Sequence, residues 1–178
     1  VYVHAFMDGR DCSPTSGVGF LRALLGKLKE IGVGKLATVA GRYYAMDRDK
    51  RWERVEKAYR AMVNGEGLTT NDTIGAMGKS YDEGVTDEFI VPLVISDEQG
   101  PKEGRIRSGD VGIFFNFRAD RGRELSWALS DEDFNEFSRP DNLTIDLINL
   151  TQYDEKLKCK VAFPPVKLTN ILGEVLAR

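Results

Sequence analysis

The chain has 178 residues, 42% of them hydrophobic and 30% charged, which suits one compact domain with a buried core. It has 25 Lys and Arg against 28 Asp and Glu, and the resulting net charge of -3 excludes a broadly basic coat for nucleic acid. No apolar stretch approaches the ~20 residues that cross a bilayer, so we expect no membrane protein. The two cysteines, Cys12 and Cys159, lie far apart in sequence, which argues against a disulfide scaffold and makes a reducing cytoplasm the default compartment.

Both ends of the sequence have the patterns of secondary structure that are usual in the interior of a domain. Residues 1–7 already resemble a core strand and contain no signal-peptide pattern, and residues 170–176 are typical of a helix or of the approach to one. Domains usually end in polar linkers instead. We therefore expect residues 1–178 to be one domain cut from a longer protein.

The first part of the chain alternates strand and helix patterns. A β-branched and aromatic run over residues 1–7 predicts a buried strand. Pro14, preceded by a serine that suits an N-cap, favours the start of a helix whose apolar residues recur at helical spacing as far as Ile31. A second strand is expected over residues 36–40.

The rest of the chain continues this alternation. In chain order we expect an amphipathic helix from Trp52 to Met62, a weaker helix over 73–81, a strand over 88–95, a surface loop over 96–104, a strand over 111–117 that is covered on both faces, a helix over 120–129, a short helix after 130–133 and a strand over 143–150. Pro92 places the 88–95 strand at an edge or a bulge. The alternation predicts an α/β fold, a three-layer α/β/α single domain with a mostly parallel sheet.

Three loops that follow predicted strands carry arginine side chains. The candidate site residues are Arg10 and Asp11 after the first strand, Arg42 and Arg48 after the second, and Arg118 and Arg121 after the strand over 111–117. The carboxyl ends of parallel strands share the edge of an open α/β sheet where ligands bind, so we expect these six side chains to line one crevice.

The chemistry that suits such a crevice is narrow. An arginine has a permanent charge and a planar fork of donors that matches carboxylate and phosphate oxygens. Five arginines overcompensate a single carboxylate, so a small ligand with both a phosphate and a carboxylate fits better. Asp11 would hold a substrate hydroxyl and take its proton. The alternative is that these arginines are solvated surface charges and that Arg48 merely pairs with Asp47.

Other signals for chemistry in the sequence are weaker. His4 is the only histidine and lies within a predicted strand, so we expect a core residue and no histidine-based metal site. Cys12 has no nearby base to activate it and is expected to be a small packing residue. Residues 17–19 lack the third glycine of a dinucleotide-binding fingerprint.

Three segments closely resemble the cofactor-independent (2,3-bisphosphoglycerate-independent) phosphoglycerate mutases. They are residues 8–11 (DGRD), residues 41–52 (GRYYAMDRDKRW) and residues 115–121 (FNFRADR). The resemblance runs nearly end to end. It implies a two-domain enzyme, in which a phosphatase-like domain holds two metal ions, usually Mn²⁺, and a serine nucleophile. The second domain, inserted into the first, binds the glycerate part of the substrate, and this chain resembles most of that inserted domain.

The resemblance also implies a reaction and a role for each candidate residue. The full-length enzyme, an isomerase of glycolysis and gluconeogenesis in the cytoplasm, interconverts 3-phosphoglycerate and 2-phosphoglycerate through a phosphoserine on the other domain. By motif match, Arg10 and Asp11 hold the glycerate hydroxyls, Asp11 transfers a proton, Arg42 and Arg48 bind the carboxylate, and Arg118 and Arg121 reach the phosphoryl group. The family's serine, its metal ligands, a substrate-contacting histidine and a lysine have no counterpart here. We therefore expect no metal site in this chain and no activity from it alone.

Two other functions stay open at this point. The first is a module that acts alone and captures phosphoglycerate or similar anions without chemistry. A domain for nucleic acid or protein interaction, using the basic helix over 48–60, belongs to a third class. The net charge and the lack of exposed aromatic platforms disfavour it, so we expect no nucleic-acid partner. The expected partners are the two phosphoglycerates and the missing metal-binding domain.

Overall fold

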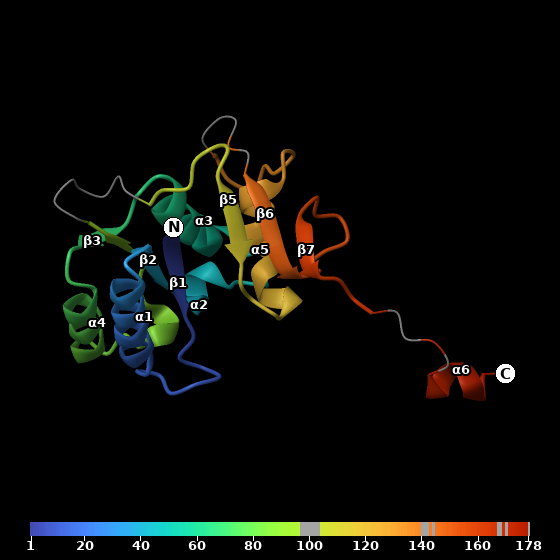
Figure 1. The fold of residues 1–178 in the computed structure, drawn as a ribbon, viewed down its shortest axis with the longest axis horizontal. Helices are drawn as coiled ribbons and strands as arrows, with labels where there is room; N and C mark the ends of the chain where they lie inside the picture. Colours follow the sequence, from blue (N-terminus) through green and yellow to red (C-terminus); the bar gives the residue numbers. More distant parts are fainter. Residues whose placement is uncertain (97–103, 140–142, 144, 167–168, 170, 178) are drawn as a thin grey trace.

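The computed structural model describes residues 1–96, 104–139, 143, 145–166, 169 and 171–177 (Figure 1). Its strands are β1 (Tyr2–Met7), β2 (Lys35–Gly41), β3 (Leu68–Thr70), β4 (Leu93–Ile95), β5 (Val111–Phe114), β6 (Asp146–Thr151) and β7 (Lys160–Phe163). Its helices are α1 (Gly17–Ile31), α2 (Arg42–Ala45), α3 (Trp52–Val63), α4 (Thr73–Asp82), the 3₁₀ helix η1 (Asp87–Phe89), α5 (Ala119–Ser130) and α6 (Leu172–Leu176).

The described strands form two sheets. The first has four strands in the order β1-β2-β4-β3, and the second has three strands in the order β5-β6-β7. All neighbours pair in parallel except β2 and β4, which are antiparallel. The predicted α/β class with mostly parallel pairing is therefore confirmed, but the pairing is divided between two sheets where the sequence predicted one.

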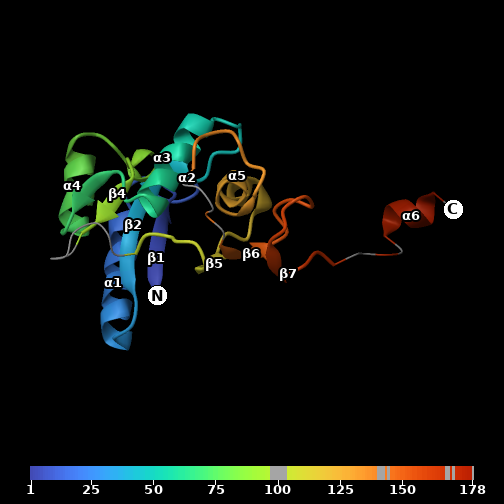
Figure 2. The same cartoon turned by 90° about the horizontal axis from the view of Figure 1, so that it is seen from above.

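Helices cover both faces of the first sheet, as the three-layer prediction requires. On one face, Leu21 of α1 and Met77 of α4 pack with Val39 of β2 and Leu93 of β4 in a common buried cluster. On the other face, the small residues Ala40 of β2 and Ala58 of α3 allow close packing between strand and helix. Figures 1 and 2 show the sheet between these two layers of helices.

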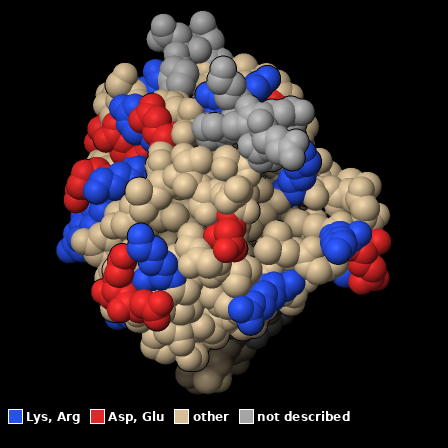
Figure 3. Space-filling view, turned by 90° about the vertical axis from the view of Figure 1, so that its left-hand side faces the viewer, with Lys and Arg blue, Asp and Glu red and all other residues tan. Residues whose placement is uncertain are grey.

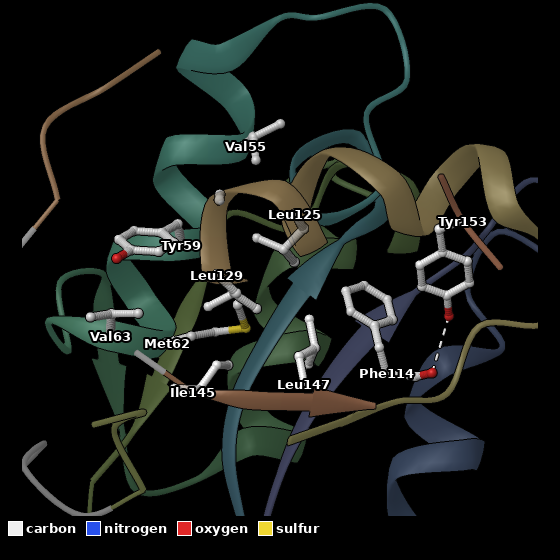
Figure 4. Packing of buried hydrophobic residues seen from close by; sticks show 11 residues of the cluster. Val55, Tyr59, Met62, Val63, Phe114, Leu125, Leu129, Ile145, Leu147 and Tyr153 are labelled. Atoms are coloured by element: carbon white, nitrogen blue, oxygen red, sulfur yellow. Dashed lines mark hydrogen bonds between the residues drawn. The ribbon is translucent and has the colours of Figure 1, made fainter. Parts of the chain in front are cut away.

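The second core joins α3 and α5 to the strands β5 and β6 (Figure 4). The described members of this cluster are Val55, Tyr59, Met62, Val63, Phe114, Leu125, Ala128, Leu129, Ile145, Leu147 and Tyr153. The rings of Phe6 in β1 and Phe114 in β5 lie 5.7 Å apart between their centroids. This contact holds the edge of the first sheet against the edge of the second, and so sets the positions of the loops that follow β1 and β5.

The second sheet is covered on one face only, which contradicts the prediction for residues 111–117. Phe114 is buried against α5, whereas Val111 and Ile113 on the opposite face of β5 are 66% and 63% exposed. The strand itself ends at Phe114. Figure 2 shows α5 over one face of this sheet and no helix of the described residues over the other. A continuous apolar run does not reveal whether one or two layers cover it.

Other element boundaries also differ from the prediction. The expected strand over 88–95 is shorter, because η1 occupies its beginning and β4 starts only after Pro92, which has no N–H for a ladder. The first helix begins at Gly17 instead of near Pro14, and its C-cap Gly32 has a φ of 74°, a left-handed conformation that favours glycine. The segment expected as a short helix after 130–133 has turns instead over its described residues.

The remaining expectations lie at the surface or outside the described residues. Most of the expected loop over 96–104 falls outside them. Near the carboxyl end, α6 forms where a helix was expected, and none of its residues is buried. On the side that carries α4, basic and acidic side chains of the described residues are interspersed (Figure 3). Among the described helices, none is long and apolar enough to cross a membrane.

Candidate functional site

The loops that follow β1, β2 and β5 meet at the carboxyl ends of these strands. Arg10 and Asp11 lie in the turn after β1, Arg42 begins α2, Arg48 lies between α2 and α3, Arg118 is the N-cap of α5, and Arg121 lies in the first turn of α5. Ion pairs, hydrogen bonds and charge interactions link these residues across the three loops. The structure therefore brings all six candidate residues to one edge of the molecule.

Arg42 is the buried centre of this edge, with a side chain that is only 6% exposed. Its Nη1 donates to Asp8 Oδ1 and, at 3.1 Å, to Asp11 Oδ2. Burial opposes the charge of Arg42, but the hydrogen bonds with the two aspartates outweigh it and raise the pKa of the guanidinium. Partial burial likewise acts against ionised Asp8, yet the bond from Arg42 holds the pKa of that carboxyl below its usual value. Arg42 is a fixed cation.

Arg118 and Arg48 are more exposed and share one carboxylate. Arg48 Nη1 lies 2.8 Å from Asp120 Oδ2, and Arg118 Nη2 lies 3.4 Å from the same oxygen. Arg118 also approaches Asp11 Oδ2 with its Nη1 at 3.7 Å. Pairs this exposed contribute about 0–1 kcal/mol each, so an incoming anion can replace them at little cost. The alternative in which Arg48 pairs with Asp47 is not what the structure shows.

Arg121 projects from α5 toward the loop after β2. Its Nη1 donates to the main-chain oxygen of Met46 at 2.7 Å. Burial and the nearby charges of Arg42 and Arg48 lower the pKa of Arg121. Arg10 adds to the same repulsion. These arginines are therefore close enough to raise one another's electrostatic energy, and an anion between them would lower it.

Two buried donors at this edge lack acceptors among the described residues. They are Arg42 Nε and Arg121 Nε. Buried polar atoms usually have partners, so each such atom calls for an explanation. Arg10 differs from these two arginines because its side chain is 63% exposed and its Nη1 lies 3.9 Å from Glu88 Oε1. The edge thus combines Arg42 and Arg121, each held by a hydrogen bond, with three arginines that are more exposed.

The carboxylates at this edge reduce its net charge. Asp8, Asp11, Asp120 and Glu88 each pair with one or more of the five arginines. Sequence reasoning had missed three of them as site residues. Asp8 and Asp120 lie inside the motifs that carry the arginines, so the alternation of Asp and Arg in these motifs could have indicated them as ion-pair partners. No sequence pattern pointed to Glu88, because it lies in η1, far along the chain from the three segments that carry the arginines.

Asp87 supports the loop that carries Arg10 and Asp11. Its carboxylate is completely buried and accepts hydrogen bonds from the main-chain N–H of Gly17 at 2.7 Å and from the Tyr81 hydroxyl. Its own N–H donates to Pro14 O at 2.8 Å. One buried residue therefore ties the end of the first loop to α1 and α4.

Tyr153 supports the third loop in a similar way. Its hydroxyl donates to the main-chain oxygen of Phe114 at the end of β5 (Figure 4) and also to that of Asn116. Burial raises the pKa of this hydroxyl to about 12. Gly122 lies against the ring, since a Cβ there would be 2.6 Å from a ring atom. This packing sets the direction from which α5 presents Arg118 and Arg121.

His4 and Cys12, the weaker candidates from the sequence, contact neighbouring side chains outside the arginine edge. His4 is partly buried and its Nδ1 lies 2.9 Å from Thr38 Oγ1, and burial lowers the pKa of the imidazole to about 4. Cys12 accepts a contact from the Ser16 hydroxyl at 3.4 Å. Among the described residues, no group of three or more His, Cys, Asp and Glu is placed to hold a metal ion. The side chains at this edge are instead arginines paired with carboxylates.

The fold and this edge define an α/β domain in which arginines from three loops meet at the carboxyl ends of the strands. The family model described as the BPG-independent PGAM N-terminus matches residues 1–155. The chain belongs to this family, the 2,3-bisphosphoglycerate-independent phosphoglycerate mutases, as the resemblance of its motifs predicted.

Individual relatives show how much of such a protein the chain spans. It is 53% identical over 178 residues to a 2,3-bisphosphoglycerate-independent phosphoglycerate mutase of Clostridium perfringens (strain SM101 / Type A), and 49% identical to one of Moorella thermoacetica. Each match covers 99% of this chain and 34% of the relative. The crystal structure of Leishmania mexicana phosphoglycerate mutase at low cobalt concentration matches with a TM-score of 0.86 and 35% identity, over 99% of this chain and 34% of that one.

Proposed function

We propose that this chain is the substrate-binding domain of a phosphoglycerate mutase that interconverts 3-phosphoglycerate and 2-phosphoglycerate. The observation that carries this proposal is the meeting of five arginines from three loops at one strand-end edge, with Arg42 and Arg121 held in place. The phosphoserine intermediate would form on a part of the enzyme beyond these residues. The role is that of a cytoplasmic enzyme of glycolysis and gluconeogenesis.

The position of each side chain suggests its part in binding. Arg42, fixed by Asp8, would provide a rigid contact for the substrate carboxylate, with Arg48 closing over it from the neighbouring loop. Arg118 and Arg121 would meet the phosphoryl group, where arginine donors stabilise developing negative charge.

The glycerate hydroxyls would lie between Arg10 and Asp11. Asp11 would take a proton from the reacting hydroxyl as general base. It must first exchange its contacts with Arg42 and Arg118 for substrate.

The uncovered face of the second sheet supports the proposal of a second domain. Val111 and Ile113 on this face are exposed, as are Phe115 and Phe117 just beyond β5. Contiguous apolar surface of this kind usually marks an interface. Since the chain spans 34% of its relatives, we infer that a metal-binding, phosphatase-like part of a longer chain packs near this side.

The metal ions of the proposed enzyme would be bound by that other part. Two Mn²⁺ or similar ions would there activate the serine and stabilise the transferred phosphoryl group. The five guanidinium cations at this site repel a metal ion, and among the described residues no group of three or more His, Cys, Asp and Glu is placed to hold one. We therefore assign no metal-dependent step to the residues described here.

Titration calorimetry with 3-phosphoglycerate tests the proposal, with D-glycerate and inorganic phosphate as controls. We expect binding that needs both the carboxylate and the phosphate. Arg42→Ala should weaken it by about tenfold or more, because a charge-assisted contact is worth ~1.5–3 kcal/mol. Arg22→Ala removes an exposed charge from α1 and should leave binding unchanged. Equal effects of both variants, or equal affinity for inorganic phosphate alone, would contradict a dedicated substrate site.

An isolated anion-binding module is the second candidate function. The same geometry supports capture of phosphoglycerate without chemistry, and we expect no mutase activity from the pure chain. A coupled assay of 2-phosphoglycerate formation tests this expectation. Turnover that Arg118→Ala abolishes would show that the chain is catalytic by itself.

A further inference from the structure

Two buried carboxyl groups lie beside the arginine edge and take no part in the function proposed above. Asp47, in the loop between α2 and α3, is 5% exposed, and Glu124 of α5 is 6% exposed. The two side chains interact directly although they are far apart in sequence. Two ionised carboxylates in direct contact would repel each other strongly, so the contacts around each of them must be compared.

Asp47 is surrounded by donors. Its Oδ2 accepts hydrogen bonds from the main-chain N–H groups of Asp49 at 2.9 Å and Arg51 at 3.0 Å. Its Oδ1 lies 3.6 Å from Arg54 Nη1 of α3. Hydrogen bonds and a cation of this kind favour the charged form of a carboxyl group. Asp47 is thus the hydrogen-bond acceptor of the pair, because both of its oxygens already face donors.

Glu124 is surrounded differently. Its Oε1 accepts one hydrogen bond, from the Lys50 N–H at 2.8 Å, while its Oε2 is buried and has no partner among the described residues. A proton on Oε2 would turn this orphaned acceptor into a donor aimed at Asp47. Burial and the nearby charges of Asp47 and Asp49 raise the pKa of Glu124 to about 7, against the opposing effect of the Lys50 N–H.

We propose that Glu124 is a positioning residue, which as a carboxylic acid donates a hydrogen bond to the Asp47 carboxylate and so fixes the loop of residues 46–51 to α5. Its effect on ligand binding rests on the function proposed above. This loop carries Arg48, and α5 carries Arg121 one turn before Glu124. The carboxyl pair therefore sets the distance between two arginines of the site without touching the ligand.

The main chain of this loop shows why such a lock is needed. Lys50 has a φ of 57°, which is the one positive value at a non-glycine residue among the described residues. A left-handed conformation costs a residue with a side chain roughly 1–2 kcal/mol, so the surrounding contacts must hold it. Consecutive N–H groups of residues 49, 50 and 51 all donate to the Asp47–Glu124 pair.

The charged groups around Glu124 decide how the lock responds to pH. Asp47 and Asp49 face it from the loop, Arg54 of α3 acts through Asp47, and Arg121 precedes it on α5. Since the pKa is raised in the folded state, the contribution of Glu124 to stability is complete below about 4.5 and is lost as the pH rises through about 7. Above that pH the two carboxylates repel and the loop loosens.

The closing experiment uses the 178-residue chain and two substitutions of Glu124. In Glu124→Gln the amide donates to Asp47 and accepts from the Lys50 N–H, but it does not titrate. Glu124→Met removes both bonds. Carbon-13 NMR of the wild-type carboxyls should give a Glu124 midpoint near 7. Protection of the Lys50 amide from exchange, relative to Glu124→Gln, should fall about fivefold or more from about pH 6 to about pH 8.5.

Binding of 3-phosphoglycerate provides the second readout. Affinity of the wild type relative to Glu124→Gln should fall severalfold over the same range, and Glu132→Gln, an exposed control just after α5, should follow the wild type. A Glu124 midpoint near its ordinary value, or equal amide protection in the wild type and Glu124→Gln at every pH, overturns the proposal. If no variant binds 3-phosphoglycerate, the proposed function fails while the NMR readout still decides the role of Glu124. If Glu124→Met does not fold, Glu124→Gln alone carries the comparison.

Discussion

Asp87→Ala tests whether one buried carboxylate holds the first arginine loop in place. Asp87 is completely buried, and its side chain accepts from the Gly17 N–H and the Tyr81 hydroxyl. Truncation to alanine removes the acceptor of the buried Gly17 N–H and of the partly buried Tyr81 hydroxyl. Each orphaned donor costs ~1–3 kcal/mol, so the free energy of unfolding should fall by about 2–6 kcal/mol. The chain has a total stability of roughly 5–15 kcal/mol to lose, so the change is large.

Urea unfolding followed by circular dichroism measures this loss, and an unchanged m-value would show that the unfolded state is not altered. Asp72→Ala is a matched control, because Asp72 is an exposed N-cap whose Oδ1 accepts one hydrogen bond from the Gly75 N–H at 2.9 Å. Loss of this N-cap hydrogen bond should lower the free energy of unfolding by only ~0.5–2 kcal/mol.

A double-mutant cycle isolates the bond between Asp87 and Tyr81. Tyr81→Phe should destabilise the wild type by about 1–3 kcal/mol but have little further effect in the Asp87→Ala background. The Asp87 N–H also donates to Pro14 O in the first loop, so a shift of Asp87 should loosen this loop and weaken 3-phosphoglycerate binding. If Asp87→Ala costs no more than Asp72→Ala, the carboxylate does not support the loop and the reasoning is refuted.

Three further predictions concern packing and pH. Gly122→Ala should lower stability by ~1–3 kcal/mol in thermal unfolding, because its Cβ would lie 2.6 Å from the Tyr153 ring, whereas Gly26→Ala in open space on α1 should stabilise. Tyr153→Phe leaves the Phe114 and Asn116 oxygens without their donor and should cost about 1–3 kcal/mol, without the steric strain of Gly122→Ala. His4 has a pKa lowered from 6.5 to about 4, so the chain should lose up to about 3 kcal/mol as the pH falls through this window, and His4→Gln should flatten that slope. A His4→Gln profile with the wild-type slope would assign the acid sensitivity to other groups.

The candidate site was largely predictable because its rule is local. Arg10, Arg42 and Arg118 each stand just after a strand pattern, and parallel strands end at the same edge. Their partners were less predictable. Asp120 pairs with Arg48 across 72 residues, and no sequence pattern measures such a distance.

The fold shows the same division. Helix α3 followed from its 3.6-residue period, which depends on the chain alone. The strand over 111–117 was expected to be covered on both faces, and the structure exposes Val111 and Ile113, because coverage depends on what else packs there. The division into two sheets was also invisible, since pairing partners are set by tertiary packing.

The sequence by itself determined the α/β class, the family and the positions of the arginines, because these depend on periodicity, local turns and short motifs. Only the tertiary structure decided which arginines are buried and which are exposed. Arg42 is fixed by Asp8, while Arg118 shares its contacts with Asp11 and Asp120 at longer distances. The raised pKa of Glu124 likewise depends on burial and on Asp47, which lies far away in the sequence. Charge interactions act through space and fall off over a few ångströms, so folding alone sets their strength.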